Sequence, residues 1–401
     1  MKILFLTSRV PYPPLGGDRL RAFHFIKALS QQHRVTLLSF AAGPDEMENL
    51  HPIAKHVERF ETVMLDPRRS YLNCLAGLFS RKPLQVHYYR SDEMRSLIRA
   101  HLARENFDLI FVHLARMADY IHEMNGLPKI MDLTDALSMN YERSAVLQRR
   151  NHLSAYNLAQ KVESRRIRNY EAQVVDWFDC NLLISPVDRD YLSRFTAANK
   201  VQVIGPAVDL SYFHYASGQY DPNTIVFMGK MSTFPNKDAA LYFYDEIFPL
   251  VVQRFPKMQF NIVGIEPGAE ILALRRHPNV TVTGYVPDVR PYLQQAALSI
   301  CPMRTGAGAK NKVLESLAAG TPVVATSLGV EGIVLRPEED ALVADTPHAF
   351  ANAIARLVEN PGMRQRLSRN GRRLIEEKYS WELVLTQLNE LVNSFKGRNK
   401  F

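Results

Sequence analysis

A glycine-rich loop followed by a polar helix start carries the strongest chemical signal in the chain. The loop 306–309, Gly-Ala-Gly-Ala, runs into a helical pattern that begins near Asn311. Asn311 and Glu315 are four residues apart, and Lys312 and Glu315 are three apart, so these side chains lie along one side of that helix. A carboxylate there can accept both hydroxyls of a ribose, and a lysine beside it can neutralise a diphosphate. The same spacing also fits an ordinary Lys–Glu pair on the surface.

A second candidate for anion binding lies near the N-terminus. Gly16 and Gly17 follow the apolar run 3–7 and precede a helical pattern that starts at about Arg19. Free N–H groups and the helix dipole favour a phosphate at such a position, and glycines let a ligand approach the backbone. Arg21 lies on the first turn, where a cation is unfavourable unless an anion is near. A plain turn before a helix would also explain the paired glycines.

Further candidates stand where an apolar run ends. Gly229 and Lys230 follow the run 224–228, and Asn236 and Lys237 lie at the start of the next helical pattern. We expect them, together with Gly308 of the glycine loop, to contact an anionic ligand, because ligands of doubly wound sheets bind outside the carboxyl ends of the strands.

The N-terminal half offers one histidine and two aspartates at strand ends. His113 ends the run 109–113, and Asp132 and Asp135 end or follow the run 130–133. His113 is a candidate for contacting a ligand, and a histidine that is hydrogen-bonded within a loop is the alternative. The aspartates are candidates for binding hydroxyls of a ligand, or they cap the next helix.

These residues need strands and helices that hold them at one edge of a sheet. Short β-branched runs alternate with helical patterns along the chain, which predicts parallel sheets of the doubly wound α/β class. Loop-forming residues between 206 and 222 interrupt the alternation, so we expect an N-terminal domain at 1–205, a linker at 206–222 and a C-terminal domain at 223–379. The runs read as strands are 3–7, 35–40, 63–65, 109–113, 130–133, 181–185, 201–204, 224–228, 260–263, 280–283, 298–301, 323–326 and 342–344.

Composition restricts the class of protein. The 401 residues exceed what one core usually holds, and 46% hydrophobic with 22% charged residues is typical of a globular protein. No apolar run reaches the ~18 residues of a membrane-spanning helix, and the apolar start is too short for a signal peptide, so we expect a cytoplasmic location. The three cysteines lie far apart without the spacing of metal ligands, which argues against a disulfide framework or a zinc site.

The net charge of +8 predicts an acidic partner. Basic residues alternate with apolar ones in the segment 149–168, which fits an amphipathic helix against an anionic membrane or a helix with a solvated charged face. Nucleic acid is not expected, because the chain lacks an aromatic and basic platform for single strands. The basic residues of the segment are Arg149, Arg150, Lys161, Arg165, Arg166 and Arg168.

Three motifs together resemble the GT-B glycosyltransferases of the glycosyltransferase 4 type. They are the opening strand with its Gly-Gly loop, Gly-Tyr-Val-Pro-Asp-Val at 284–289, and Asn-Lys-Val-Leu-Glu-Ser-Leu-Ala-Ala-Gly-Thr-Pro-Val-Val at 311–324. The resemblance covers almost the whole chain. The start Arg-Val-Pro-Tyr-Pro-Pro at 9–14, through Gly17, Asp18, Arg21 and Phe23, with Met117-Ala118 and 132–135, is similar to the subgroup associated with exopolysaccharide and exosortase (PEP-CTERM) systems.

The resemblance implies two Rossmann-like domains that face each other across a cleft, with a nucleotide-sugar donor held mainly by the C-terminal one. By position, Glu315 matches the glutamate that binds ribose, and Lys230 and Lys237 fall near the basic contacts to the diphosphate. The loop around Val286 would lie by the base. Gly16 and Gly17 would face the diphosphate, and the segment 380–401 would pack back on the first domain.

One position departs from the family. The carboxylate eight residues before the glutamate is replaced by Ala307, so backbone N–H groups of 306–309 are expected to substitute for it. The family implies a retaining transfer in which stabilising charge on the leaving diphosphate matters most, and we assign that role to Lys230 and Lys312, with no metal. The acceptor would be a glycan or a lipid-linked sugar at the inner membrane face. With this family, His113 would orient the donor or acceptor sugar, and Asp132 and Asp135 would bind hydroxyls of the acceptor. The alternatives are a nucleotide-sugar epimerase and a non-catalytic binding module.

Overall fold

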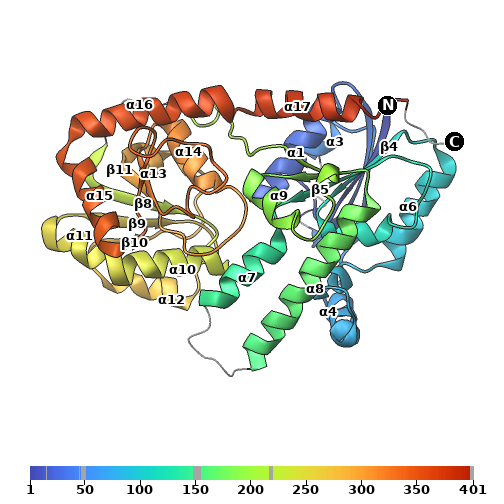
Figure 1. The fold of residues 1–401 in the computed structure, drawn as a ribbon, viewed down its shortest axis with the longest axis horizontal. Coiled ribbons are helices and arrows are strands. Elements are labelled where there is room, and N and C mark those ends of the chain that lie inside the picture. The colour runs from blue at the N-terminus through green and yellow to red at the C-terminus, as the bar shows by residue number, and fades with distance from the viewer. Residues whose placement is uncertain (15, 45, 47–50, 148–154, 216–219, 398–401) are drawn as a thin grey trace. The chain divides into compact units, whose positions relative to one another are not determined.

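The computed structural model describes residues 1–14, 16–44, 46, 51–147, 155–215 and 220–397. The chain divides into two compact units (Figure 1). The first comprises Met1–Gly205 together with 384–397, and the second comprises Pro206–Leu383. Each unit is an α/β structure with its own parallel sheet, as the alternating pattern predicts.

Seven parallel strands form the sheet of the first unit, in the order β3-β2-β1-β4-β5-β6-β7. Ile3 in β1 pairs with Val35 in β2 and with Leu109 in β4, and all three side chains are fully buried. Central strands covered on both faces read as continuous apolar runs, which is why runs such as 3–7 and 109–113 form strands here. The edge strand β3 is mostly exposed or half-buried and begins at Arg59, four residues before the predicted run 63–65. The strands are β1 Lys2–Thr7, β2 Arg34–Ala41, β3 Arg59–Met64, β4 Leu109–His113, β5 Lys129–Thr134, β6 Cys180–Leu183 and β7 Val201–Val203.

Helices connect these strands, and local capping sets several of their starts. The Asp66 carboxylate accepts the N–H of Arg68 at the start of α4, and the Ser91 hydroxyl accepts the N–H of Met94 in α6. The helices are α1 Gly17–Leu29, α3 His51–Ala54, α4 Pro67–Ala76, α5 Leu84–Tyr88, α6 Asp92–Arg104, α7 Leu137–Leu147, α8 Ala155–Trp177 and α9 Pro186–Leu192, with short turns η1 Gly77–Phe79, η2 Ala115–Tyr120 and η4 Ala198–Lys200.

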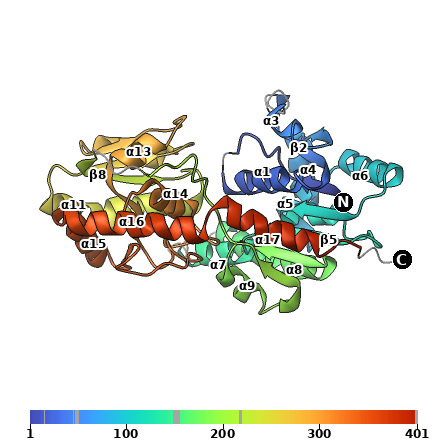
Figure 2. The same cartoon turned by 90° about the horizontal axis from the view of Figure 1, so that it is seen from above.

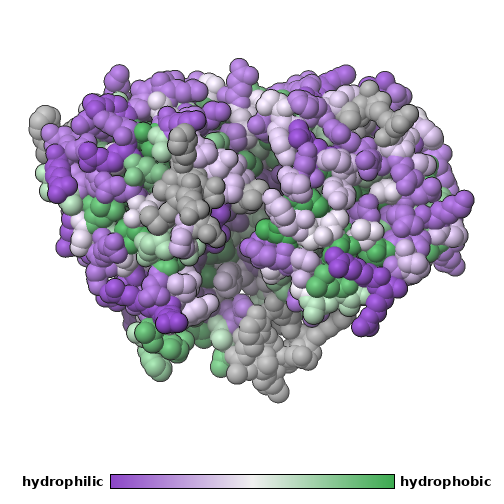
Figure 3. All heavy atoms as spheres, turned by 180° about the vertical axis from the view of Figure 1, so that it is seen from behind, coloured by the Kyte–Doolittle hydropathy of each residue, from purple (hydrophilic) through white to green (hydrophobic). Residues whose placement is uncertain are grey.

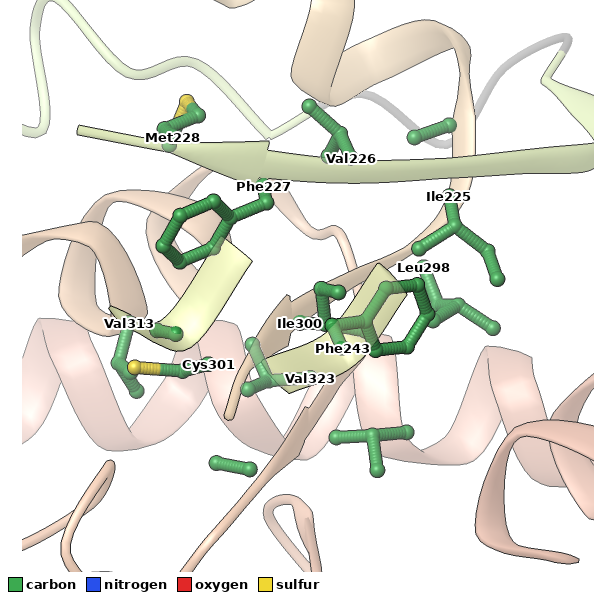
Figure 4. Packing of buried hydrophobic residues seen from close by; sticks show 14 of the residues in the cluster. Ile225, Val226, Phe227, Met228, Phe243, Leu298, Ile300, Cys301, Val313 and Val323 are labelled. Carbon is green, nitrogen blue, oxygen red and sulfur yellow. The ribbon is translucent and has the colours of Figure 1, made fainter. Parts of the chain in front are cut away.

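The second sheet has six parallel strands in the order β10-β9-β8-β11-β12-β13. Phe227 of β8 is fully buried and lies over Val313 and Cys301, while Phe243 packs beside Leu298 and Ile300 of β11 (Figure 4). This apolar core holds the strand ends rigidly. The strands are β8 Asp221–Met228, β9 Gln259–Val263, β10 Val280–Val282, β11 Ala296–Cys301, β12 Val323–Ala325 and β13 Leu342–Val343.

The helices of the second unit include α14, which carries the polar cluster of the sequence analysis. Gly320, in a left-handed conformation, ends α14, and the guanidinium of Arg372 in α16 donates to the carbonyl of Ala318 at 2.7 Å. Figure 2 shows α16 running beside α14. The helices are α10 Phe234–Tyr242, α11 Phe248–Arg254, α12 Ala269–Ala273, α13 Arg290–Gln295, α14 Asn311–Ala319, α15 Pro347–Glu359, α16 Pro361–Lys378 and α17 Trp381–Asn393, with the π-turn η5 Phe243–Ile247 and the 3-10 turn η6 Leu274–Arg276.

The predicted linker 206–222 is too long at its C-terminal end. β8 begins at Asp221, which pairs with Ala296 of β11. The carboxylate of Asp221 accepts hydrogen bonds from the N–H of Asn223 and the hydroxyl of Thr224, so residues that look like a turn close the start of a strand instead. Ser217 and Gly218 of the predicted linker lie outside the described residues.

The basic segment 149–168 is described only from residue 155 onward, so Arg149 and Arg150 lie outside the described residues. In α8, Arg166 pairs with Glu163 at 3.5 Å and Arg168 pairs with Glu142 at 3.4 Å, whereas Lys161 and Arg165 are exposed. Two of its arginines therefore bind acids of their own unit. In the part of the chain that the structure describes, no helix is long and apolar enough to cross a membrane.

Candidate functional site

The second sheet reverses its strand order between β8 and β11. The chain adds β9 and β10 on one side of β8 and then returns to place β11 on the other side. Crevices outside the carboxyl ends of strands at such a reversal are where doubly wound sheets bind ligands. Gly229 and Lys230 follow β8 at this point, and the loop 306–309 with α14 follows β11. Gly229, Lys230 and the donor residues of the loop 306–309 and α14 therefore share one edge of this sheet.

Asn236 joins the two loops. The ammonium of Lys312 donates to Oδ1 of Asn236 at 2.6 Å, and Nδ2 of Asn236 donates to the carbonyl of Lys230 at 3.0 Å. A Cβ on Gly229 would lie 2.7 Å from Nδ2 of Asn236, so only glycine permits this approach. The predicted residues Gly229, Lys230 and Lys312 are thus brought together by the side chain of Asn236, itself one of the predicted anion-binding candidates.

Lys312 and Glu315 form no ion pair with each other within the described residues, which sets aside the interpretation as a surface pair. Lys312 lies 4.2 Å from the centroid of the Phe227 ring, and burial lowers its pKa to about 8. Burial also raises the pKa of the Glu315 carboxyl to about 7, against the opposing charge of Lys312. Both groups are poorly hydrated, so a ligand that offers hydroxyls or a phosphate has the chemistry to satisfy them.

Lys310 holds the glycine loop in place, and the sequence analysis missed this residue. Its ammonium donates to the carbonyl of Ala307 at 3.1 Å and to that of Gly308 at 2.5 Å, and the side chain is 8% exposed. The lysine therefore fixes the backbone where Ala307 lacks a carboxylate. Only its position directly after the glycine loop could have suggested this role. Asn311 opens α14 and is partly buried.

Lys230 and Lys237 are less free than the sequence suggests. Lys230 pairs with Glu266 at 2.8 Å, and Lys237 pairs with Glu270 at 2.7 Å. The hydrogen bond from Lys230 lowers the pKa of the Glu266 carboxyl. Both lysines remain substantially exposed, so a diphosphate would compete with two glutamates for them.

The loop 284–289, predicted to lie by the base, follows β10. Val286 is partly buried and packs against the core of the unit, while Tyr285 beside it is exposed. Val286 therefore contributes mainly to the packing of the core, and Tyr285 is the side chain of this loop that is exposed.

In the first unit, three predicted site residues form one buried cluster. Nδ1 of His113 lies 2.9 Å from Oδ2 of Asp132, and Nε of Arg21 donates to both carboxylate oxygens at 3.1 and 3.0 Å. The remaining nitrogens of Arg21 donate to the carbonyls of Ile204 and Gly205. Burial raises the pKa of the Asp132 carboxyl, but Arg21 and His113 outweigh it and lower the pKa below its ordinary value.

This cluster corrects two interpretations. The sequence places Arg21 at the donor because a cation on a first helical turn needs an anion, and the structure supplies that anion internally as Asp132. The sequence predicts that Asp132 binds ligand hydroxyls, but Asp132 is fully buried, with Oδ1 bound to Arg21 and Oδ2 bound to Arg21 and His113. Instead, Asp132 holds the ring of His113 through a hydrogen bond, and Arg21 holds the carboxylate of Asp132.

His113 is itself buried, with 2% of its surface exposed, and one of its ring nitrogens lacks a hydrogen-bond partner. A carboxylate only accepts, so Nδ1 carries a proton toward Asp132, and Nε2 is buried without a hydrogen-bond partner in the structure. Gly16 precedes α1 and Gly17 opens it, and a phosphate contact at this turn stays a prediction. Asp135 is partly buried, and its N–H donates to the carbonyl of Leu133.

Comparisons with solved structures identify the architecture. A sucrose-phosphate synthase from Thermosynechococcus elongatus superimposes with a TM-score of 0.75 at 18% identity, covering 99% of this chain and 100% of that one. The Anabaena protein HepE, solved in complex with UDP and glucose, gives a TM-score of 0.69 at 16% identity, covering 98% and 100%. The protein has the GT-B fold.

The sequence comparisons concern mainly the second half of this GT-B chain. Residues 222–360 match the family model described as glycosyl transferases group 1. A phosphatidyl-myo-inositol mannosyltransferase of Mycobacterium tuberculosis is 30% identical over 184 residues, which are 43% of this chain and 48% of the relative. The chain thus matches about half the length of the first curated relatives. These matches support a glycosyltransferase activity, and the exosortase subgroup stays a prediction.

The group 1 match divides the candidate residues of the GT-B protein into two sets. Those from Gly229 to Glu315 lie within 222–360, so the cluster at the strand reversal belongs to the matched region. Gly16, Gly17 and His113 lie outside it and depend on the geometry of the first unit alone.

Proposed function

We propose that this protein is a retaining glycosyltransferase that moves a sugar from a nucleoside diphosphate sugar to a glycan or lipid-linked acceptor. The observation that carries the proposal is the cluster of Lys312, Asn236 and Glu315 at the strand reversal of the second sheet. It combines a carboxylate suited to two vicinal hydroxyls with a poorly hydrated ammonium suited to a phosphate.

In this proposal Glu315 accepts the ribose hydroxyls of the donor. Lys312 and Lys230 bind the diphosphate, and Lys230 exchanges Glu266 for a phosphate oxygen. The bond between the anomeric carbon and the diphosphate oxygen breaks, and its electron pair stays on that oxygen. The acceptor oxygen bonds to the same face of the sugar, and its proton passes to the departing diphosphate. Cations around the leaving group stabilise the charge that develops there, and no metal is required.

In the first unit, His113 is the residue suited to holding a sugar hydroxyl. Asp132 fixes its ring through Nδ1, which leaves Nε2 as an acceptor for a hydroxyl proton. We assign Arg21 and Asp132 to positioning this ring. Gly16 and Gly17, at the start of α1, are proposed to offer N–H groups to the diphosphate.

The proposed acceptor class rests on two supports. One is the similarity to a protein described as a phosphatidyl-myo-inositol mannosyltransferase, and the other is the N-terminal motif similar to the exopolysaccharide and exosortase subgroup. Both point to a sugar acceptor attached to lipid or to a growing polysaccharide. The protein would then work at the inner membrane face without spanning it.

Titration calorimetry with UDP, GDP and ADP and with their sugars tests the donor. We expect one nucleotide to bind, and Lys312→Met to weaken its binding about tenfold or more by removing a charge-assisted contact. Lys257→Met, at an exposed lysine of the same unit, is the matched control and should bind like the wild type. Failure of all three nucleotides to bind, or unchanged binding by folded Lys312→Met, would contradict the proposal.

The configuration of the product tests the chemistry. With an acceptor present, NMR of the anomeric proton should show the configuration of the donor sugar, and an inverted product would exclude retention. A new nucleotide sugar formed with no acceptor would identify the alternative activity, an epimerase.

A further inference from the structure

Helix α4 and the turn η1 reverse the usual arrangement of a surface helix. The inward stripe of 67–79 consists of small or polar residues, Ser70, Asn73, Cys74 and Gly77, at the helical spacing of three and four. Asn73 donates to the carbonyl of Arg90 at 3.1 Å, and the thiol of Cys74 contacts the carbonyl of Leu84 at 3.4 Å. The helix is therefore attached to its unit through its small and polar side.

Gly77 shows how closely that side packs. A Cβ at this position would collide with the ring of His87, so α4 and η1 lie directly against α5. Tyr71 contacts Tyr88 of α5 edge-to-face, with ring centroids 5.7 Å apart. Arg166 of α8 donates to the carbonyl of Leu78, which ties η1 to the first unit from another direction. The orientation of α4 is thus held by several elements.

The large apolar residues consequently face outward. Leu72 and Leu75 are 65% and 61% exposed, and Phe79 is 98% exposed. Figure 1 places α4 at the lower right, and in Figure 3, which shows the molecule from behind, hydrophobic residues protrude at the corresponding lower left. We call the side chains Tyr71, Leu72, Leu75, Leu78 and Phe79 the α4 patch. An apolar cluster that protrudes this far marks a contact surface.

The charges around the α4 patch identify its partner. The segment 67–82 holds four basic residues and no acidic one. Arg69 and Lys82 pair with acids of neighbouring elements, whereas no ion pair of Arg68 or Arg81 occurs within the described residues. A second copy of this chain would bring a like-charged surface against them, which is unfavourable. Apolar side chains with arginines beside them match the boundary between acyl chains and anionic headgroups.

We propose that the α4 patch docks on an anionic lipid surface. Leu72, Leu75 and Phe79 enter the acyl region, and Arg68 and Arg81 lie at the headgroups. α4 follows β3 directly, so the patch lies toward the carboxyl edge of the sheet, the edge at which β4 ends in His113. A lipid-linked substrate would be presented at that edge. The surface is argued from its own residues and does not depend on the donor site.

Co-sedimentation with vesicles tests the proposal. The full chain is mixed with vesicles of phosphatidylcholine alone or of phosphatidylcholine with phosphatidylglycerol, at low and high salt. We expect the wild type to sediment with the anionic vesicles. The triple variant Leu72→Gln, Leu75→Gln, Phe79→Gln should lose at least about tenfold in partitioning. Arg68→Gln with Arg81→Gln should lose about fivefold for each arginine at low salt.

Matched control variants test whether the loss of any exposed apolar residues, or of any exposed arginines, has the same effect. Leu272→Gln, Val334→Gln and Leu383→Gln remove three exposed apolar residues of the second unit, and Arg366→Gln with Arg369→Gln removes two exposed arginines of α16. Both control sets should sediment like the wild type. The thermal unfolding midpoint and nucleotide binding of every variant are measured alongside to confirm folding.

Three outcomes would overturn the proposal. They are sedimentation of both patch variants at the wild-type level, equal loss in the control sets, and a dimer in vesicle-free ultracentrifugation that the triple variant abolishes, which would assign the patch to a second copy. Nucleotide binding that fails while vesicle binding depends on the α4 patch would count against the proposed function only, so the two proposals fail separately.

Discussion

Replacing Glu315 tests whether its carboxylate is kept for a ligand or for stability. The folded chain holds the Glu315 proton with a pKa of about 7, against an ordinary value of 4.5. Because the folded state binds this proton more tightly than the unfolded chain, the contribution of Glu315 to the free energy of unfolding falls as the pH rises from 4.5 through about 7. Above about pH 7 the Glu315 carboxylate is ionised in a partly buried position, which lowers the free energy of unfolding.

The size of that cost follows from the two pKa values. Their difference corresponds to about 3 kcal/mol, and partial hydration of the site reduces it to about 1 to 2 kcal/mol. Glu315→Gln keeps the shape of the side chain and removes the charge. We therefore expect the variant to be more stable than the wild type above pH 7 by about 1 to 2 kcal/mol, and nearly equal to it below about pH 4.

Ligand binding should change in the opposite direction. Two ribose hydroxyls lose a charged acceptor, so Glu315→Ala should weaken binding of a nucleoside diphosphate sugar by about 1 to 3 kcal/mol, with Glu315→Gln in the same direction. Calorimetric unfolding at several pH values measures the first effect, and titration calorimetry measures the second. A folded variant with an unchanged dissociation constant, or one that is less stable above pH 7, would refute the reasoning and make Glu315 a structural residue.

Three other perturbations test the remaining groups. Asp132→Ala leaves Arg21 buried without a compensating negative charge, so urea denaturation should show the free energy of unfolding lowered by about 3 to 5 kcal/mol. A change near zero would contradict a buried ion pair. Since the pKa of Asp132 is lowered in the folded state, its contribution to stability is present at neutral pH and disappears as the pH falls below 3.8. Lys312 has a pKa of about 8, so titration calorimetry should show nucleotide affinity falling as the pH rises through 8 in the wild type, but not in Lys312→Met; a flat profile in both would remove this ammonium from the site. Turnover should survive EDTA because lysines supply the positive charge, and a loss restored by Mg²⁺ would contradict that role.

The strands were predictable because their signal is local. A strand buried on both faces must be apolar along its whole length, so a short run such as 109–113 identifies it without knowledge of its neighbours. The start of β8 was predicted wrongly because its first residues carry the opposite local signal. Asp221 and Pro222 have turn chemistry, and only pairing with β11 makes them part of a strand.

The donor cluster was predictable in part. The spacing of Lys312 and Glu315 on α14 follows from helical geometry, so their common side could be read directly. The bond from Lys312 to Asn236 joins residues 76 positions apart, and no local pattern indicates it. In the sequence Lys310 is indistinguishable from any other lysine near a loop. Only the fold shows that its ammonium donates to two carbonyls.

The sequence by itself determined that this protein has two parallel α/β sheets and that anion-binding loops follow their strands, because apolar runs and glycine turns act within a few residues. Only the tertiary structure decided which charged side chains pair with each other inside a unit. Arg21 and Asp132 are 111 residues apart and neutralise each other in a buried cluster, whereas Lys312 and Glu315 are partly desolvated without pairing. Pairing and desolvation depend on what the fold brings near each charge, and the chain order does not contain that information.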